Sequence, residues 1–298
     1  MERLGPFKEL IGMIPTHKLM LVRCLDGRSL MGRAVPAVVL GRFFGKGVIL
    51  QLRTPEFEEL LTRHRRWLMP ALRLADRIVV GSRYLERILD RAHLPVNRLA
   101  DPVTADASAY RPVGKLQPKV LVDVALEPHH QVGLAVKAFR LVKQKYPRAE
   151  LVITGSGTHL GRLERMVDDL NLAGVTFGVD LTAEELQAAR SECDIYVNPS
   201  AQEESPSGMI EAMASGLPVV CTDADGLLHL VRDGVSGLIV PMGDYVGLAD
   251  SIIELIENNE LTERLSREGL AEAKKHTWAR VRQDWVNLFH QIVGTRRN

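Results

Sequence analysis

The sequence predicts an α/β protein of two domains, each built on a parallel sheet with helices on both faces. Apolar strand-like runs alternate with helix-like segments, which is typical of such a sheet. The 298 residues suit two domains of ordinary size. A content of 46% hydrophobic and 25% charged residues is that of a globular protein and excludes an intrinsically disordered one.

A first domain is expected over residues 1–112. Its clear strands are Lys18–Arg23, Gly47–Leu52 and Arg77–Val80. Helices are expected over Glu2–Met13, over Ser29–Phe44 with an interruption at Pro36, over Pro55–Leu74, and over Ser82–Ala92. The segment Arg98–Pro112 is rich in Pro, Ala and Asp without any period, so we expect a linker there.

A second domain is expected over residues 113–275, followed by a last amphipathic helix over Thr277–Val293. Its predicted strands are Lys119–Val124, Glu150–Thr154, Val175–Phe177, a run ending at Asn198, and Val219–Val220. Its predicted helices are Val132–Tyr146, a segment from the capping box Thr182-x-x-Glu185 to Ser191, Met209–Ser215, Asp244–Asn258 and Leu261–Lys275.

The stretch Tyr196–Pro241 carries the most informative pattern, a strand, a loop, a helix and a second strand. Glu203 lies in the loop, and Glu211 lies about one turn into the helix. Between them a helix begins, and the backbone N–H groups of Ser207, Gly208 and Met209 would favour an anion by roughly 0.3–2 kcal/mol. Carboxylates are acceptors suited to sugar hydroxyls. The pattern therefore predicts a site for a phosphate and a polyol, although a loop Glu and a helix Glu on a solvated surface would show the same residues.

The segment from Glu203 to Glu211, with EAMASGLPVV, resembles the donor-site motif of the family-four glycosyltransferases, which have the GT-B fold. The family usually has EGFG-like residues where this chain has EESPSG. Its interdomain hinge is matched in part by Pro102, Asp106, Tyr110 and Pro112. The resemblance implies two Rossmann-like domains, a C-terminal helix within 276–298 that packs on the first domain, and a first domain shorter and less complete than is usual.

The resemblance also implies a function, the transfer of a sugar from a nucleotide diphosphate sugar to an acceptor with retention, in glycan or glycolipid assembly. Glu203 would hold the transferred sugar at the catalytic centre and Glu211 the nucleotide ribose. The amides of Ser207, Gly208 and Met209 would meet the sugar or a phosphate. Gly155, Gly157, Gly178 and Val179 would lie beside the nucleotide, although Gly155-Ser156-Gly157 is also compatible with a plain structural turn. No metal and no cofactor are expected.

The chain departs from the family at the positions that usually hold an Arg and a Lys to neutralise the donor diphosphate. Ala125 and His130 stand there, so two contacts of roughly 1.5–3 kcal/mol each are missing or are supplied by other residues. The candidates for these phosphate contacts are Arg53, His129 and His130. Arg53, at the end of a predicted strand, is equally compatible with a surface arginine.

Two other functions and one metal site are alternatives. The first is a non-catalytic paralogue that binds the donor or acts as a scaffold in a glycan-assembly complex, which Ala125 favours. A hydride-transferring Rossmann enzyme is disfavoured because Leu160 stands where a dinucleotide fingerprint needs its third glycine. A Mg²⁺ site at Asp223-Ala224-Asp225 has suitable ligands, but the resembling family has a metal-free loop there.

The composition predicts the cellular location of the protein and the kinds of partner it has. Three distant cysteines and no long apolar run favour the cytoplasm, and no nucleic-acid partner is expected. Residues 1–112 carry 19 Lys and Arg against 11 Asp and Glu, whereas the rest carries 19 against 26. The basic half, with Arg63, Arg65, Arg66 and Trp67, suggests peripheral contact with the inner face of an anionic membrane, or a solvated surface. The short first domain suggests a homodimer or a partner chain that completes it.

Overall fold

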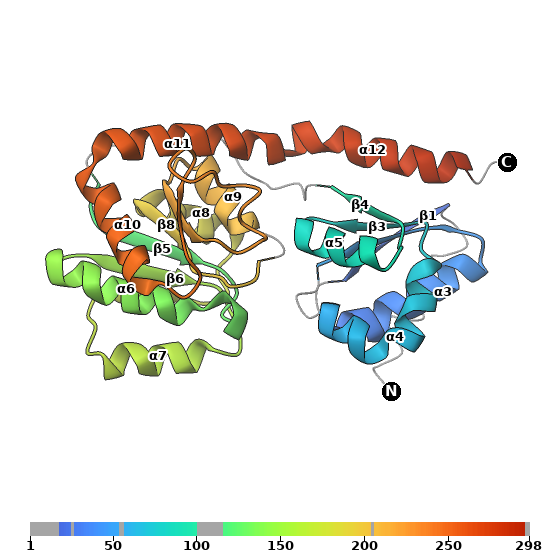
Figure 1. Cartoon of the computed structure of the whole chain (residues 1–298), viewed down its shortest axis with the longest axis horizontal. Coiled ribbons are helices and arrows are strands. Elements are labelled where there is room, and N and C mark those ends of the chain that lie inside the picture. Colours follow the sequence, from blue (N-terminus) through green and yellow to red (C-terminus); the bar gives the residue numbers. More distant parts are fainter. Residues whose placement is uncertain (1–17, 25–26, 54–56, 100–115, 204–205, 296–298) are drawn as a thin grey trace. The chain divides into compact units, whose positions relative to one another are not determined.

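The computed structural model describes residues 18–24, 27–53, 57–99, 116–203 and 206–295. Internal contacts divide the chain into two compact units, unit 1 with Met1–Asp101 and Val281–Asn298, and unit 2 with Pro102–Arg280 (Figure 1). The predicted N-terminal helix Glu2–Met13, the hinge residues Pro102 to Pro112 and the expected boundary at residue 112 lie outside the described residues.

Unit 1 contains a parallel sheet in the order β1-β2-β3-β4. Its strands are β1 (Leu19–Cys24), β2 (Gly47–Leu52), β3 (Arg77–Val80) and β4 (Val96–Arg98). The first three were predicted. β4 was not, because its three residues are too short to show a period and lie where the sequence begins to resemble a linker. The expected homodimer or partner chain stays a prediction, since residues 1–17 before β1 lie outside the described part.

The helices of unit 1 lie close to the predicted ranges. They are α2 (Gly27–Ser29), the π-helical turn η3 (Leu30–Ala34), α3 (Val35–Phe43), α4 (Phe57–Arg73) and α5 (Arg83–Arg91). The helical run from Gly27 to Phe43 changes from π-helical to α-helical hydrogen bonding just before Pro36, the second residue of α3, which agrees with the interruption predicted at this proline. Ser82 caps α5, with its Oγ accepting from Leu85 N at 3.3 Å.

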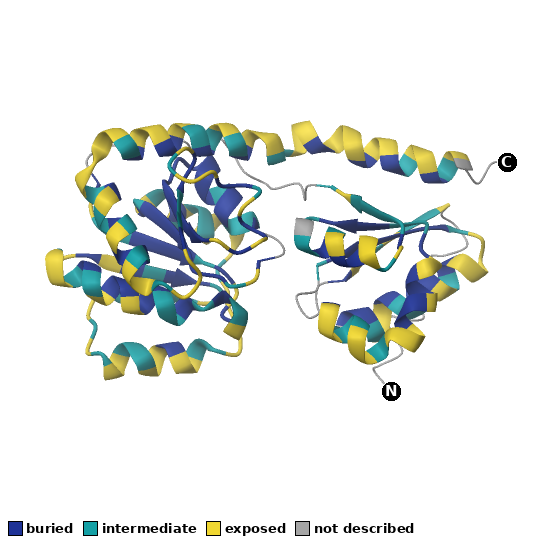
Figure 2. Ribbon diagram, in the orientation of Figure 1, coloured by how far each residue is buried: buried dark blue, intermediate teal, exposed yellow. Residues whose placement is uncertain are grey.

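Both faces of the unit 1 sheet are covered (Figure 2). Val48 and Leu50 of β2 pack with α3, α4 and α5 on one face. Ile49, which alternates with them, points to the opposite face and packs with Trp285 and Leu288 of the C-terminal helix α12 (Trp278–Thr295). This confirms the expectation that the last helix returns to the first domain.

Unit 2 contains a parallel sheet in the order β10-β9-β8-β5-β6-β7. The strands are β5 (Lys119–Asp123), β6 (Glu150–Thr154), β7 (Val175–Gly178), β8 (Ile195–Asn198), β9 (Val219–Thr222) and β10 (Leu238–Val240). The chain runs outward from β5 to β7, and then returns to the other side of β5 with β8. In open α/β sheets ligands bind at such a switch point, beyond the carboxyl ends of the strands. The topology therefore predicts a binding site at the loops after β5 and β8.

The helices of unit 2 cover both faces of this sheet. They are η5 (Pro128–His130), α6 (Val132–Lys145), α7 (Leu160–Asp169), α8 (Ala183–Glu192), α9 (Ser207–Ala214), α10 (Tyr245–Glu257), α11 (Asn259–Ala273) and the turn η6 (Lys274–His276). Val120 and Val122 of β5 pack on the side of α6 and α10, whereas Leu121 packs on the side of α9. The sequence analysis did not predict α7, whose single fully buried residue Leu163 gives a weak apolar stripe. No described helix is long and apolar enough to cross a bilayer.

The packing of α12 gives a prediction for the stability of unit 1. Trp285 is buried against the sheet, so Trp285→Ala should lower the unfolding free energy by about 3–5 kcal/mol. Trp278→Ala is the matched control, because Trp278 belongs to the same helix and is 54% exposed. Urea denaturation measures both. Equal stability of the two variants would contradict the described packing.

Candidate functional site

The backbones of the loops after β5 and β6 are in close contact. A Cβ on Gly157 would lie 2.5 Å from the Leu126 carbonyl oxygen. A Cβ on Gly155 would overlap the carbonyl oxygen of Val124. Gly155 also has a φ of +117°, which only glycine adopts readily. The structural turn allowed for in the sequence analysis is therefore sufficient to explain both glycines. Their contact with a nucleotide stays a prediction.

The neighbouring strand β7 ends at the same edge. Gly155 N donates to the Gly178 carbonyl oxygen at 3.1 Å, which ties the end of β7 to the turn after β6. Val179 follows and is part-exposed. In the sheet order β5 and β6 lie between β7 and β8. Contact of Gly178 and Val179 with the nucleotide base stays a prediction.

Glu203 is buried beside the end of β8, with 8% of its surface exposed. Asn198 Nδ2 donates to Glu203 Oε2 at 3.3 Å, while Asn198 Oδ1 accepts from Ser200 Oγ at 2.5 Å. A Cβ on Gly226 would overlap the Glu203 carbonyl oxygen, so the backbone is also confined from the opposite side. Glu203 is therefore held by a polar network and is not a loose surface carboxylate.

His130 belongs to the same network. Its Nδ1 lies 2.9 Å from Ser200 Oγ and 3.8 Å from Glu203 Oε2. Because the Ser200 hydroxyl hydrogen is used on Asn198, Nδ1 carries the proton and donates to Ser200. Burial, with a smaller effect from the neighbouring His129, lowers the pKa of His130 to about 4. At neutral pH the ring is uncharged, so a phosphate contact by His130, which stays a prediction, would involve a neutral group.

Arg190 joins Glu211 to the end of β5. It lies on α8 with 4% of its surface exposed, and its Nη2 is 2.9 Å from Asp123 Oδ2. The same nitrogen contacts Glu211 Oε2. Asp123 Oδ1 in turn accepts from Thr154 Oγ1 at 2.9 Å. We call Asp123, Arg190 and Glu211 the Arg190 bridge.

The sequence analysis missed Asp123 and Arg190. A signal exists for each of them: Asp123 ends an apolar strand at the switch point, and Arg190 follows Leu186 by four residues on the inward stripe of α8. Neither signal shows that the two side chains meet, because 67 residues separate them in the chain.

The amino end of α9 adjoins the Arg190 bridge. A Cβ on Gly208 would lie 2.7 Å from the Asp123 carbonyl oxygen and 3.0 Å from its Oδ2, so only glycine permits this approach. The first turn of α9 holds no acidic residue. The structure thus brings Glu203, Glu211 and the Ser207–Met209 backbone to the edge formed by β5 and β8.

The remaining predicted residues belong to three loops. Arg53 follows β2 in unit 1, with its N donating to the Cys24 carbonyl oxygen at 2.9 Å. The His129 carbonyl oxygen accepts from Ala201 N at 2.8 Å, which joins the loops after β5 and β8. Asp223 Oδ1 accepts from Met242 N at 2.8 Å and so closes a loop. Within the described ranges no group of three His, Cys, Asp or Glu is placed to hold a metal ion.

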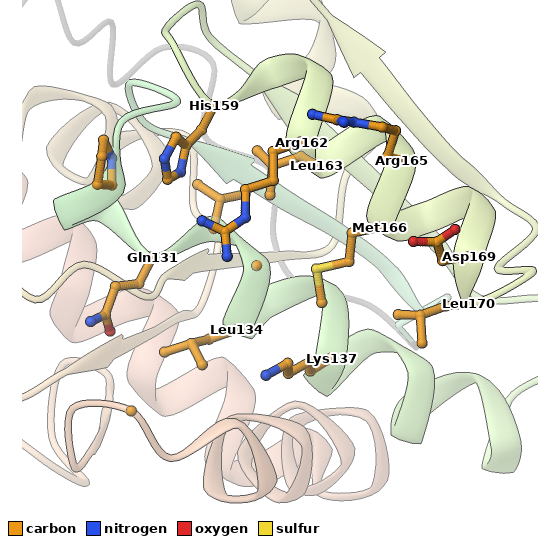
Figure 3. Close-up of a pocket in the computed structure, with 14 residues that line it drawn as sticks. Gln131, Leu134, Lys137, His159, Arg162, Leu163, Arg165, Met166, Asp169 and Leu170 are labelled. Atoms are coloured by element: carbon orange, nitrogen blue, oxygen red, sulfur yellow. The ribbon is translucent and has the colours of Figure 1, made fainter.

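A groove of about 870 Å³ lies between α6 and α7 (Figure 3). Gln131, Leu134 and Lys137 line one side, and His159, Arg162 and Met166 line the other. Its end at Pro128 and Gln131 borders the loop of His129 and His130. Neither Glu203 nor Glu211 lines it, so the groove and the carboxylate site are separate features.

Comparison with known proteins identifies the family. The model for "Glycosyl transferases group 1" matches residues 112–271, more than half of the chain. The chain belongs to this family. The matched residues of this group 1 member include both glutamates, the Arg190 bridge and the turn after β6.

Curated relatives match a little over half of the chain or more. The phosphatidyl-myo-inositol mannosyltransferase of Mycobacterium tuberculosis is 30% identical over 177 residues, which cover 57% of this chain and 46% of the relative. The poly(glycerol-phosphate) alpha-glucosyltransferase of Bacillus subtilis is 28% identical over 166 residues, covering 54% of this chain and 24% of the relative. The chain spans about half the length of the mycobacterial relative it matches.

Solved structures confirm the GT-B fold of this group 1 member. Alr3699/HepE of Anabaena, solved with UDP-glucose, has a TM-score of 0.78 at 18% identity and covers 96% of this chain and 81% of its own. Sucrose-phosphate synthase of Thermosynechococcus elongatus has a TM-score of 0.78 at 19% identity, covering 98% of this chain and 80% of its own.

The buried state of His130 gives a pH prediction. Because its folded pKa lies below the unfolded value near 6.5, its stabilising effect is present above about pH 6.5 and is lost as the pH falls toward 4. Wild-type protein should lose up to about 3 kcal/mol more stability over that interval than His130→Asn, which keeps a donor near Ser200. Denaturant unfolding at several pH values measures this, with the exposed His290→Asn as control. Parallel pH profiles for wild type and His130→Asn would show that His130 is not buried in a neutral form.

Proposed function

We propose that the protein is a retaining glycosyltransferase that uses a nucleotide diphosphate sugar. The observation that carries this proposal is the meeting of Glu203, Glu211 and the amino end of α9 at the switch point of the unit 2 sheet. Carboxylates accept hydrogen bonds from sugar hydroxyls, and a helix amino end favours a phosphate. Membership of the group 1 family and the likeness to a structure solved with UDP-glucose support the same ligand class.

In this proposal each group has one role. Glu211 accepts from the ribose hydroxyls, Glu203 accepts from the transferred sugar, and the amides of Ser207, Gly208 and Met209 meet a phosphate. The bond between the anomeric carbon and the diphosphate oxygen breaks, and the acceptor oxygen bonds to that carbon on the same face. The acceptor's proton passes to the departing diphosphate. The protein contributes positioning and electrostatics, which is sufficient for this kind of chemistry.

The names of two relatives support a polyol or lipid acceptor. One is a phosphatidyl-myo-inositol mannosyltransferase and another a poly(glycerol-phosphate) alpha-glucosyltransferase. These names support hexosyl transfer in glycan or glycolipid assembly. That the transfer needs no metal and no further cofactor is part of the proposal.

A donor-binding protein without transferase activity is the second candidate. Ala125 has no charge, and His130 is neutral at pH 7 because burial lowers its pKa to about 4. Arg190 shares its charge between two carboxylates. These three positions therefore leave a departing diphosphate poorly neutralised, whereas binding through hydroxyl groups would persist. Binding of a nucleotide sugar without hydrolysis or transfer to any lipid or polyol acceptor would favour this candidate.

Substitution of the two glutamates tests the proposed site. Each lost hydrogen bond to a charged group is worth about 1.5–3 kcal/mol, or roughly ten- to a hundredfold in affinity. Glu211→Gln should weaken both the free nucleotide and the nucleotide sugar by this factor, whereas Glu203→Gln should weaken only the nucleotide sugar. Glu164→Gln, at an exposed carboxylate of α7, is the control. Calorimetric titration with UDP and GDP sugars measures all three. Wild-type affinity in Glu211→Gln would refute the site.

Contact with an anionic membrane is a further part of the proposal. Trp67 of α4 and Phe43 at the end of α3 are each 80% exposed, and Arg63, Arg65 and Arg66 of α4 are exposed as well. Exposed aromatic rings among cations are typical of proteins that lie on a lipid surface, where each Arg contributes about 1 kcal/mol.

Vesicle flotation tests this contact. Wild-type protein should float with vesicles that contain phosphatidylserine, less so at high salt, and Trp67→Ala should reduce the bound fraction severalfold. Trp278→Ala removes an exposed tryptophan of α12 and is the matched control. Equal flotation with neutral and anionic vesicles at low salt would exclude the proposed contact.

A further inference from the structure

Arg190 is a buried cation that links three elements of unit 2. It lies on α8 and contacts Asp123 at the end of β5 and Glu211 on α9. A buried charge is costly unless it is paired and hydrogen-bonded. Here one nitrogen, Nη2, serves both carboxylates, while the buried Nε has no hydrogen-bond partner among the described residues. The guanidinium is thus only partly satisfied.

Stability alone is a weak explanation for such an arrangement. Buried ion pairs are often replaced by apolar residues of similar volume at no cost, and an unpaired buried donor costs about 1–3 kcal/mol. What the Arg190 bridge does achieve is local: it fixes the Glu211 carboxylate with respect to β5 and to Gly208 at the start of α9.

We propose that Arg190 is a positioning residue that holds the Glu211 carboxylate in place and in its ionised, acceptor-only form, with Asp123 holding Arg190. This inference rests on the proposed function, in which Glu211 accepts from the nucleotide ribose. Both oxygens of an ionised carboxylate can accept hydrogen bonds from ribose hydroxyls. A protonated carboxyl group has one O–H donor, so it offers fewer acceptors to those hydroxyls.

The groups around Glu211 determine whether loss of Arg190 would raise or lower the pKa of Glu211. Burial raises the pKa of Glu211 above its ordinary value, Arg190 offsets part of this increase, and Asp123 adds to it. Tyr196 of β8 is buried and neutral, with its hydroxyl donating to the Asp123 carbonyl oxygen at 2.9 Å. On the other side α11 meets α9 through Gly269, which faces Met213. Without Arg190 the two influences that raise the Glu211 pKa remain, so Glu211 would take up its proton at a higher pH.

Three variants distinguish the effect of the Arg190 charge from the effect of its guanidinium geometry. Arg190→Gln removes the charge, Arg190→Lys keeps it without the guanidinium geometry, and Asp123→Asn removes the competing carboxylate while leaving an oxygen for Arg190. The carboxyl carbon of Glu211, assigned with Glu211→Gln, is titrated by ¹³C NMR in the ligand-free protein. Calorimetry with the nucleotide sugar that binds wild type then runs from about pH 8.5 to about pH 5.5.

The inference predicts a pH-dependent loss. Between about pH 8.5 and about pH 5.5 the affinity of wild type should change less than that of Arg190→Gln, which should bind more weakly toward acid pH, by about tenfold for each pH unit below the Glu211 pKa of that variant. The Glu211 titration should move upward in Arg190→Gln, less so in Arg190→Lys, and downward in Asp123→Asn. If Arg190→Gln does not fold, Arg190→Lys and Asp123→Asn still test the direction in which the Glu211 pKa changes.

Other outcomes separate this inference from the proposed function. Unchanged Glu211 titration, with Arg190→Gln weakened equally at every pH, would overturn the inference and reduce Arg190 to a structural residue, while nucleotide-sugar binding by wild type would stand. An upward-shifted titration together with no binding of any nucleotide sugar by wild type would support the control of the Glu211 charge by Arg190 and refute the proposed ligand.

Discussion

The Arg190 bridge is the interaction on which the candidate site depends. Three charged side chains are withdrawn from water where β5, α8 and α9 meet, and burial of that kind is tolerated only when the charges oppose one another. Their mutual attraction fixes the start of α9 against the end of β5, where Gly208 allows the backbones to touch. Glu203 has a parallel support in Asn198 and the neutral His130.

This electrostatic arrangement makes the site rich in acceptors and poor in free positive charge. Glu203 and Glu211 supply carboxylate oxygens, His130 is uncharged because burial lowers its pKa to about 4, and Arg190 is shared. Such a site suits hydroxyl groups better than a diphosphate. The α9 amides are therefore the described groups best suited to the phosphates of the proposed ligand, and phosphate contacts by Arg53 and His129 stay predictions.

The sequence predicted most elements of the fold because alternating apolar runs and helical stripes are local signals. It also located Glu203 and Glu211, since the motif that contains them is continuous. It did not find Asp123 and Arg190 as partners, because their meeting depends on the order of strands in the folded sheet. The neutrality of His130 was equally out of reach, because it follows from burial and not from residue type. The strands β4 and β10 were missed because each has only three residues, and the helix α7 was missed because it is largely exposed.

The central claim is that the edge formed by β5, β8 and α9 binds a nucleotide diphosphate sugar. A thermal-shift panel of nucleotides and nucleotide sugars tests it most directly. A ligand present at about 100 times its dissociation constant should stabilise the protein by about 2.7 kcal/mol, and this stabilisation should fall to about 0.4–1.4 kcal/mol in Glu211→Gln, whose affinity is expected to be ten- to a hundredfold weaker. A panel with no stabilising nucleotide sugar, or a shift that persists undiminished in Glu211→Gln, would contradict the account.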